Sequence, residues 1–244
     1  MSWRATSAAR SVILDVFTLS YRRFAVAGDV IEENHRTIDE QLAALRFFDA
    51  RAARPTNAGV LLFGRDPVYF LPGAYVQHVR YDGTTLADEV SRERRFEGDL
   101  LTVLRGLDSL AEDLAETRPE PLPSGGDQLV HAYPPRTLHE LLMNAVIHRN
   151  YDGSTTPVLV NHFTDRVEIQ SPGGLYGDLT AARFPGGTSY RNPIVAEAAK
   201  VLGFVNRFGR GIAIAQALLA KNGSRPAEFD VGSNHLSVTI WRRR

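Results

Sequence analysis

One stretch of the chain carries polar side chains at a spacing suited to chemistry. Residues 138–149 read L-H-E-L-L-M-N-A-V-I-H-R, so Glu140, Asn144 and His148 stand at every fourth position. In a helix this spacing places all three on one stripe. An amide oxygen can ligate a hard Mg²⁺ ion, and a carboxylate one turn away can orient or deprotonate a water. The stripe indicates a metal–nucleotide site; the alternative is a set of ordinary solvated polar residues.

Two glycine turns follow this stripe. The first, Ser171-Pro172-Gly173-Gly174-Leu175, comes directly after an apolar strand pattern, and its glycines permit positive φ or close approach of a flat ligand. A tight turn with no ligand is the alternative interpretation. The second, Gly209-Arg210-Gly211, opens a helix whose free N–H groups and positive dipole end can hold phosphate.

The elements that must position these groups are predicted after residue 128. Hydrophobic periodicity distinguishes helices from strands, and the strand pairs are separated by short turns. Helices on one face of a mostly antiparallel sheet make an α+β layer. The predicted helices are Pro135–Arg149, Asn192–Leu202 and Gly211–Ala220, and the predicted strands are Pro157–Phe163, Arg166–Ser171, Phe229–Val231 and His235–Trp241.

The first half of the chain predicts a smaller α+β accessory region. Thr37 with Glu40 forms a capping-box pattern at the start of a helix. The region between Arg118 and Gly126 is rich in proline and glycine, which predicts a linker. We therefore expect an amino-terminal extension (1–34), an accessory region (35–123) and a ligand-binding domain (128–244). Within the accessory region the predicted elements are helices at Thr37–Phe48, Thr56–Phe63 and Phe96–Leu114, and a strand at Ala74–Tyr81.

Composition excludes several classes of protein. The 244 residues contain no cysteine, which excludes disulfide scaffolds, zinc–thiolate sites, iron–sulfur clusters and cysteine nucleophiles. A net charge of zero argues against a general nucleic-acid or membrane-surface binder. The longest apolar runs, such as Val60–Phe63, fall far short of the roughly 18 residues that a membrane span needs. Asp15 interrupts the apolar run near the amino terminus, so we expect a cytoplasmic protein without a signal peptide.

The sequence does not match two common catalytic motifs, and its charged carboxy-terminal segment has a simple interpretation. His139 and His148 lack the spacing of two histidines one turn apart that a zinc-protease helix requires. No serine stands in a G-x-S-x-G nucleophile setting. Arg242, Arg243 and Arg244 predict a solvated basic tail, with contact to nucleic acid as the alternative.

The order of these motifs resembles a known superfamily. A helix with E-x-x-x-N, a strand ending in a glycine turn, a Gly/Pro-rich span and G-x-G at a helix start together resemble the GHKL or Bergerat-fold ATP-binding domains. The wording of Leu138–Tyr151, Glu168–Leu175, Arg191–Pro193 and Gly209–Ile212 looks closest to the RecG-like carboxy-terminal ATP-binding domain of bacterial Schlafen/AlbA-type transcriptional regulators. The likeness runs from about residue 35 to residue 244. It implies a Bergerat-type two-layer α/β sandwich, with helices on one face of a mixed, mostly antiparallel sheet.

The resemblance also implies ligands and residue roles. It makes ATP and Mg²⁺ the ligands, Asn144 the metal ligand and Glu140 the base or orienting carboxylate. The span Pro172–Phe208 would be a lid that orders over nucleotide. The remaining residues implied at the nucleotide are His148, Ser171, Gly173, Gly174, Arg191, Asn192, Gly209, Arg210 and Gly211. A homodimer is a further expectation, and contact with DNA is expected only indirectly or through a partner.

The chain departs from the superfamily at the base site. Ser171 stands where an Asp is expected to accept a hydrogen bond from the adenine amino group, and Leu175 replaces the second glycine of that motif. Exchanging a charge-assisted hydrogen bond for a neutral one costs about 1–2 kcal/mol, or about 5- to 30-fold in affinity. Two functions stay open: a regulatory ATP-binding protein with slow or no hydrolysis, or an interaction module that has lost nucleotide binding.

Overall fold

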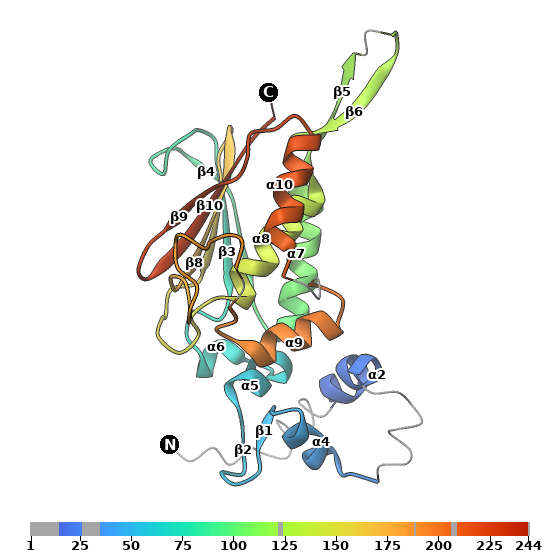
Figure 1. The fold of residues 1–244 in the computed structure, drawn as a ribbon, viewed down its shortest axis with the longest axis vertical. Helices are drawn as coiled ribbons and strands as arrows, with labels where there is room; N and C mark the ends of the chain where they lie inside the picture. Colours follow the sequence, from blue (N-terminus) through green and yellow to red (C-terminus); the bar gives the residue numbers. More distant parts are fainter. Residues whose placement is uncertain (1–14, 26–34, 122–123, 188, 206–208, 244) are drawn as a thin grey trace.

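The computed structural model describes residues 15–25, 35–121, 124–187, 189–205 and 209–243, and it folds into two layers (Figure 1). One layer is a six-stranded sheet in the order β4-β3-β7-β8-β10-β9, and only the β3–β7 pair is parallel. This confirms the predicted α+β class with a mixed, mostly antiparallel sheet. The strands are β3 (Val76–Tyr81), β4 (Val90–Phe96), β7 (Val158–His162), β8 (Arg166–Pro172), β9 (Glu228–Val231) and β10 (His235–Trp241).

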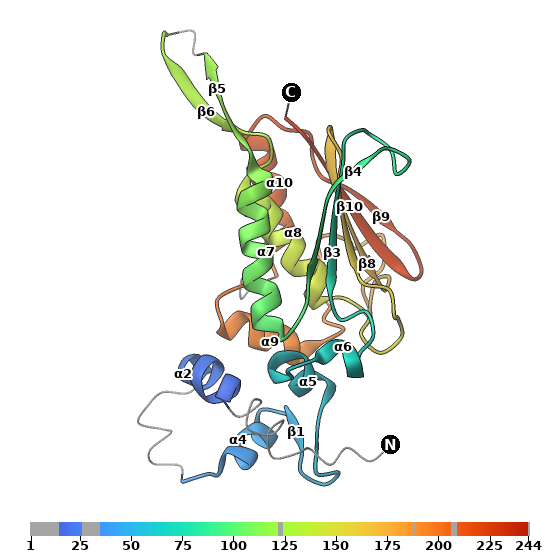
Figure 2. The same cartoon turned by 180° about the vertical axis from the view of Figure 1, so that it is seen from behind.

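Helices cover one face of this sheet. α8 (Pro135–Ile147) lies between α7 (Leu100–Ala115) and α10 (Gly211–Lys221), and α9 (Pro193–Val201) crosses near their lower end (Figures 1 and 2). Leu138 of α8 is completely buried. The helix layer therefore holds α8, which carries the predicted polar stripe, directly against the sheet.

Strand alternation explains which side of the sheet the helices cover. Val167 and Ile169 of β8 are buried on the helix side, whereas Glu168 between them lies on the other, more open face. Val158 and Val160 of β7 follow the same alternation. The sheet therefore contributes branched aliphatic side chains to the core through every second residue.

The amino-terminal part packs beneath the two layers. It contains η1 (Phe17–Tyr21), α2 (Arg22–Ala25), α4 (Ile38–Ala44), β1 (Phe48–Asp49), β2 (Arg54–Pro55), α5 (Asn57–Phe63) and α6 (Pro67–Phe70). Phe17 and Tyr21 join Phe47 and Phe63 in a buried aromatic cluster, with ring centroids 5.0–6.5 Å apart. The rest of the predicted extension, residues 1–14 and 26–34, lies outside the described residues.

Local predictions in this half are partly confirmed. Thr37 and Glu40 form the predicted capping box, but α4 ends at Ala44 instead of continuing to Phe48 because the chain turns into the β1–β2 hairpin. The helix predicted from Phe96 begins at Leu100, since Phe96 is the last residue of β4. β4 itself was missed because its exposed sequence, V-S-R-E-R-R-F, lacks the apolar alternation of a strand.

The predicted linker is wrong in its conformation. Residues 117–121 form β5 and residues 127–131 form β6, an antiparallel hairpin that projects beyond the helix layer (Figures 1 and 2). The predicted solvated tail is also wrong for two residues, because Arg242 pairs with Glu116, just before β5, and Arg243 pairs with Glu120 on β5. Arg244 and the hairpin residues 122–123 lie outside the described residues.

The six-stranded sheet contains strands from both sides of the predicted boundary at residue 128. β3 and β4 precede the boundary, and β3 pairs directly with β7, which follows it. None of the helices in the described ranges is long and apolar enough to cross a bilayer.

Candidate functional site

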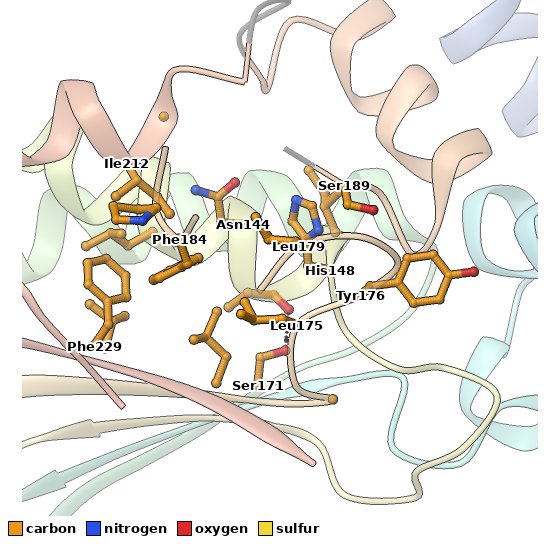
Figure 3. A pocket seen from close by; sticks show the side chains of 18 of the residues that line it. Asn144, His148, Ser171, Leu175, Tyr176, Leu179, Phe184, Ser189, Ile212 and Phe229 are labelled. Carbon is orange, nitrogen blue, oxygen red and sulfur yellow. Dashed lines mark hydrogen bonds between the residues drawn. The ribbon is translucent and has the colours of Figure 1, made fainter. Parts of the chain in front are cut away.

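A cavity of about 110 Å³ lies between α8, the ends of β8 and β10, and the first turn of α10. Residues 173–187 and 189–190, called the covering segment here, fold over it. Asn144 and His148 project toward the cavity from α8, while Ser171 lies across from them on the sheet (Figure 3). Among the predicted site residues that line the cavity, the two farthest apart in sequence are Asn144 and Gly211, 67 positions apart.

The two glycines of the second turn meet the α8 stripe. Gly209 and Gly211 both line the cavity. A Cβ atom at Gly211 would lie 2.7 Å from Glu140 Oε2 and 3.2 Å from Asn144 Nδ2, so only glycine lets the start of α10 approach these side chains. Gly209 has a φ of +62°, the left-handed region that glycine adopts without strain. The predicted neighbourhood of helix stripe and glycine turn is therefore present.

Glu140 and Asn144 have different surroundings on the same helix. The Glu140 side chain is 2% exposed, and its Oε1 lies 2.7 Å from Arg136 Nη2 one turn earlier. It stands behind Gly211 and does not line the cavity itself. Asn144 does line the cavity, and its side-chain amide makes no hydrogen bond with any residue in the described ranges. Asn144 is therefore the group of the pair that is available to a ligand.

His148 forms part of the cavity wall next to the covering segment. Its ring stacks on Tyr190, with centroids 5.3 Å apart and planes 17° from parallel. Burial, with a smaller contribution from Arg191, lowers the pKa of His148 to about 4. The imidazole is consequently neutral near pH 7, which makes it a wall or hydrogen-bonding group and not a cation for phosphate.

Ser171 is the penultimate residue of β8, which ends at Pro172, one residue later than predicted, and its hydroxyl is already engaged. Ser171 Oγ donates to the carbonyl oxygen of Ala145 at 2.7 Å, a contact that ties the strand end to α8 (Figure 3). A hydroxyl has one proton but can also accept hydrogen bonds. The oxygen facing the cavity is thus left as an acceptor.

The glycines after Ser171 are required by the fold itself. Gly173 has a φ of +104°, and its N–H donates to the carbonyl of Asn234 at 2.7 Å. A Cβ at Gly174 would lie 2.4 Å from the carbonyl oxygen of Gly232 in the β9–β10 turn. The tight turn is therefore present, and both glycines also line the cavity, where their contact with a ligand stays a prediction.

Three predicted ligand residues do not line the cavity. Arg191 Nη2 donates to the carbonyl of Gly174 at 3.1 Å and its guanidinium lies over the ring of Tyr176. Asn192 Nδ2 donates to the carbonyls of Ile147 and Arg149, which caps the end of α8. Arg210 is exposed at the N-cap of α10. In this conformation Arg191 and Asn192 hold the covering segment and the helix end.

Sequence reasoning missed the apolar lining of the cavity. Phe184 of the covering segment meets Phe229 of β9 edge-on, with ring centroids 5.2 Å apart. The signal was present in the large apolar residues of an otherwise Gly/Pro-rich span and in the alternation of β10. The apolar lining includes Leu175, Leu179, Phe184, Ile212, Phe229, Leu236 and Val238.

Part of the chain is similar to a known protein family. Residues 155–240 match the family described as "Putative ATP-dependent DNA helicase recG C-terminal". This is an ATPase-like domain family, and the match supports an ability to bind ATP. The matched range contains Ser171 and the glycine turns but begins after α8 and its polar stripe. A comparison with curated proteins finds no match.

A solved structure shares the fold. The crystal structure of the DIP2311 protein from Corynebacterium diphtheriae aligns with a TM-score of 0.72 and 21% sequence identity. The alignment covers 99% of this chain and 46% of that one, so the chain spans about half the length of that protein. At this identity the likeness shows the fold alone.

Proposed function

We propose that the chain binds ATP with Mg²⁺ in the cavity between α8, β8 and α10, and that binding serves a regulatory, transcription-associated role with slow or no hydrolysis. The observation that carries the proposal is the meeting of Asn144, Ser171 and the Gly209–Gly211 turn at one cavity. Ser171 and the glycine turn also lie within residues 155–240, which match an ATPase-like family. The regulatory part rests on the resemblance to the carboxy-terminal domains of Schlafen/AlbA-type regulators.

The donor set fits a nucleotide-bound Mg²⁺ ion. No cluster of three or more acidic or histidine side chains suited to a metal occurs in the described ranges, so an all-protein cage is not available there. Mg²⁺ in nucleotide sites usually takes one or two protein oxygens and otherwise waters and phosphate oxygens. Asn144 Oδ1 would be the protein ligand, and the ion would supply neutralisation of phosphate charge. The N–H groups at the start of α10 would face the phosphates.

Slow turnover follows from the surroundings of Glu140. Its Oε1 lies 2.7 Å from Arg136 Nη2, and its side chain does not line the cavity, so the carboxylate is not placed directly at a bound phosphate. Glu140 Oε2 faces the Gly211 turn, from which it would orient a water.

Ser171 supports adenine as the base. Because its proton is donated to Ala145, the hydroxyl presents an acceptor, which suits the amino group of adenine and not the carbonyl of guanine. Donating to guanine would mean giving up the bond to Ala145, at a cost of about 1 kcal/mol. We therefore expect ATP to bind about fivefold or more tightly than GTP.

Calorimetric titration of the purified chain with ATP and with GTP, each with and without Mg²⁺, tests the proposal. Binding that needs Mg²⁺ and prefers ATP is expected. Ser171→Ala should reduce the preference for ATP, while Ser237→Ala, on the opposite face of the sheet, serves as the matched control. Absence of heat with either nucleotide would refute ATP binding.

One observation favours the second candidate, an interaction module without nucleotide. The cavity of about 110 Å³ is smaller than the roughly 300–1,000 Å³ of typical ligand pockets, and Phe184 and Phe229 meet within its lining. ATP binding requires the covering segment to move outward. If the segment does not move, the same fold acts only through its surface.

A further inference from the structure

The β5–β6 hairpin, called the arm here, has two unlike edges. The arm comprises residues 117–121 and 127–131 and projects away from both layers (Figures 1 and 2). Pro119 and Pro121 lie opposite Leu129 and Asp127. Proline has no N–H, so these positions cannot be the hydrogen-bonded pairs of the ladder.

The hydrogen-bonded pairs must then be the alternate positions. Arg118 pairs with Val130 and Glu120 with Gln128, and the same parity continues where Ala132 N–H donates to the carbonyl of Glu116 at 2.8 Å. Residues of the other parity direct their backbone groups outward. On β5 the outward positions include two prolines, which blocks the addition of another strand. On β6 they present complete peptide groups at Asp127 and Leu129.

The outward edge of β6 is open along its middle. The Leu129 side chain is 74% exposed, the largest exposure among the large apolar side chains of the described residues. Beside β6 lies an open groove of about 650 Å³, bordered by Glu112 of α7 and Lys221 of α10. At the base, Asn222 Nδ2 donates to the carbonyl of His131 at 3.0 Å, so the carbonyls without such a contact on this edge are those of Asp127 and Leu129. An exposed strand edge with a large apolar side chain favours pairing with another strand.

We propose that β6 pairs with β6 of a second copy of this chain, antiparallel and about a twofold axis at Leu129. The sequence D-Q-L-V-H is complementary to itself in this register. Leu129 then faces Leu129 of the second copy, and Asp127 faces His131 twice, so an apolar pair lies between two acid–imidazole pairs. The result is a four-stranded sheet with a proline-blocked edge on each outer side. A two-stranded hairpin standing alone is marginally stable, which gives pairing a further gain.

The mass of the purified chain in solution, measured by light scattering without nucleotide, gives the first test. A dimer is expected. Leu129→Pro removes the outward N–H at the axis but no ladder bond inside the arm, so it should weaken association by at least about tenfold. A thermal melt of the variant checks that it folds.

Cross-linking gives the second test and decides the question if Leu129→Pro does not fold. The chain has no cysteine, so Leu129→Cys introduces a single thiol. Directly opposed residues in a hydrogen-bonded pair have Cα atoms about 5.5 Å apart, within the range of a disulfide. Oxidation should give a disulfide-linked dimer much faster than in Leu86→Cys, whose parent side chain is similarly exposed. A monomeric wild type, or equal cross-linking rates for the two variants, would overturn the proposal.

Discussion

Glu140 and Asn144 lie one helical turn apart on α8 but have different surroundings. Asn144 faces the cavity with an amide that makes no hydrogen bond to the described residues, whereas Glu140 is buried against Arg136. A residue that faces a ligand contributes chiefly to binding. We expect Glu140, which lies behind the cavity wall, to contribute chiefly to any hydrolysis step that needs a positioned carboxylate.

Asn144→Ala should lower the Mg²⁺-dependent affinity for ATP by at least about tenfold. The reason is the loss of a metal ligand or charge-assisted hydrogen bond, about 1.4 kcal/mol. Titration calorimetry with and without Mg²⁺ measures the change. Asn161→Ala on β7, away from the cavity, is the control and should bind like the wild type. Equal affinities for wild type and Asn144→Ala would remove Asn144 from the site.

If ATP is hydrolysed, Glu140→Gln should lower turnover by about 10²-fold or more while affinity changes little. Glutamine keeps the shape and an oxygen toward Arg136 but loses the basicity. Phosphate release per folded molecule is the measurement, with exposed Glu112→Gln as the control. Turnover that matches the wild type, together with a lower melting temperature, would show that Glu140 serves only its contact with Arg136.

At the scale of elements, the covering segment closes the cavity, and a small number of side-chain contacts hold it in place. His148 stacks on Tyr190, Arg191 donates to Gly174, and Phe184 meets Phe229. These contacts join the segment to α8 and to β9 and leave its outer turns exposed. Opening for a nucleotide therefore requires these side-chain contacts to separate. It does not require any helix or strand to unfold.

Limited digestion with trypsin should report this motion at Arg183. Arg183 is exposed and is followed by Phe184. In contrast, the guanidinium of Arg191 donates to the carbonyl of Gly174 and lies over the ring of Tyr176. ATP with Mg²⁺ should slow cleavage after Arg183, because a segment ordered over nucleotide opens less often. Mass spectrometry of the fragments identifies the site. An unchanged rate at saturating ATP would mean that the segment is a fixed loop.

At the scale of the whole molecule, two neighbouring strands of the sheet each bury a histidine. His78 of β3 and His162 of β7 are 4% and 2% exposed, with ring centroids 6.3 Å apart. Burial is the main cause that lowers the pKa of each to about 4, with further lowering from Arg80 for both rings, while Glu116 raises that of His162. Both ring nitrogens of His78 lack a hydrogen-bond partner within the described part of the chain.

These histidines predict loss of stability in acid. The unfolded chain takes up protons below its ordinary histidine pKa of about 6.5, and the folded chain does so only near 4. The free energy of unfolding should therefore be constant above about pH 6.5 and fall as pH drops toward 4, by about 3 kcal/mol for one such histidine. His78→Phe removes an unsatisfied polar ring and should flatten this slope. Denaturant melts from pH 7 to pH 4 measure it; equal slopes would contradict the prediction.

Sequence pattern determined the elements from Pro135 onward and the polar stripe of α8. Local periodicity and turn residues act within a few positions, so β10 and the capping box at Thr37 were predicted correctly. β4 was not predicted, because a charged edge strand gains its stability from pairing with β3 and not from its own pattern. The arm was also missed. Its prolines predict a break in regular structure, but they occupy positions of the hairpin where the backbone N–H is not needed for pairing.

Only the tertiary structure decided what the candidate residues touch. Spacing placed Glu140 and Asn144 on one stripe, but the approach of Gly211, the bond from Ser171 to Ala145 and the capping of α8 by Asn192 each join positions 26 to 71 residues apart. Such contacts depend on how the helix and sheet layers pack and on which hydrogen-bond donors already have partners. Neither can be predicted from local sequence. The sequence by itself therefore determined which chemistry is present, and the packing of α8 between sheet and α10 decided which of those groups face the cavity.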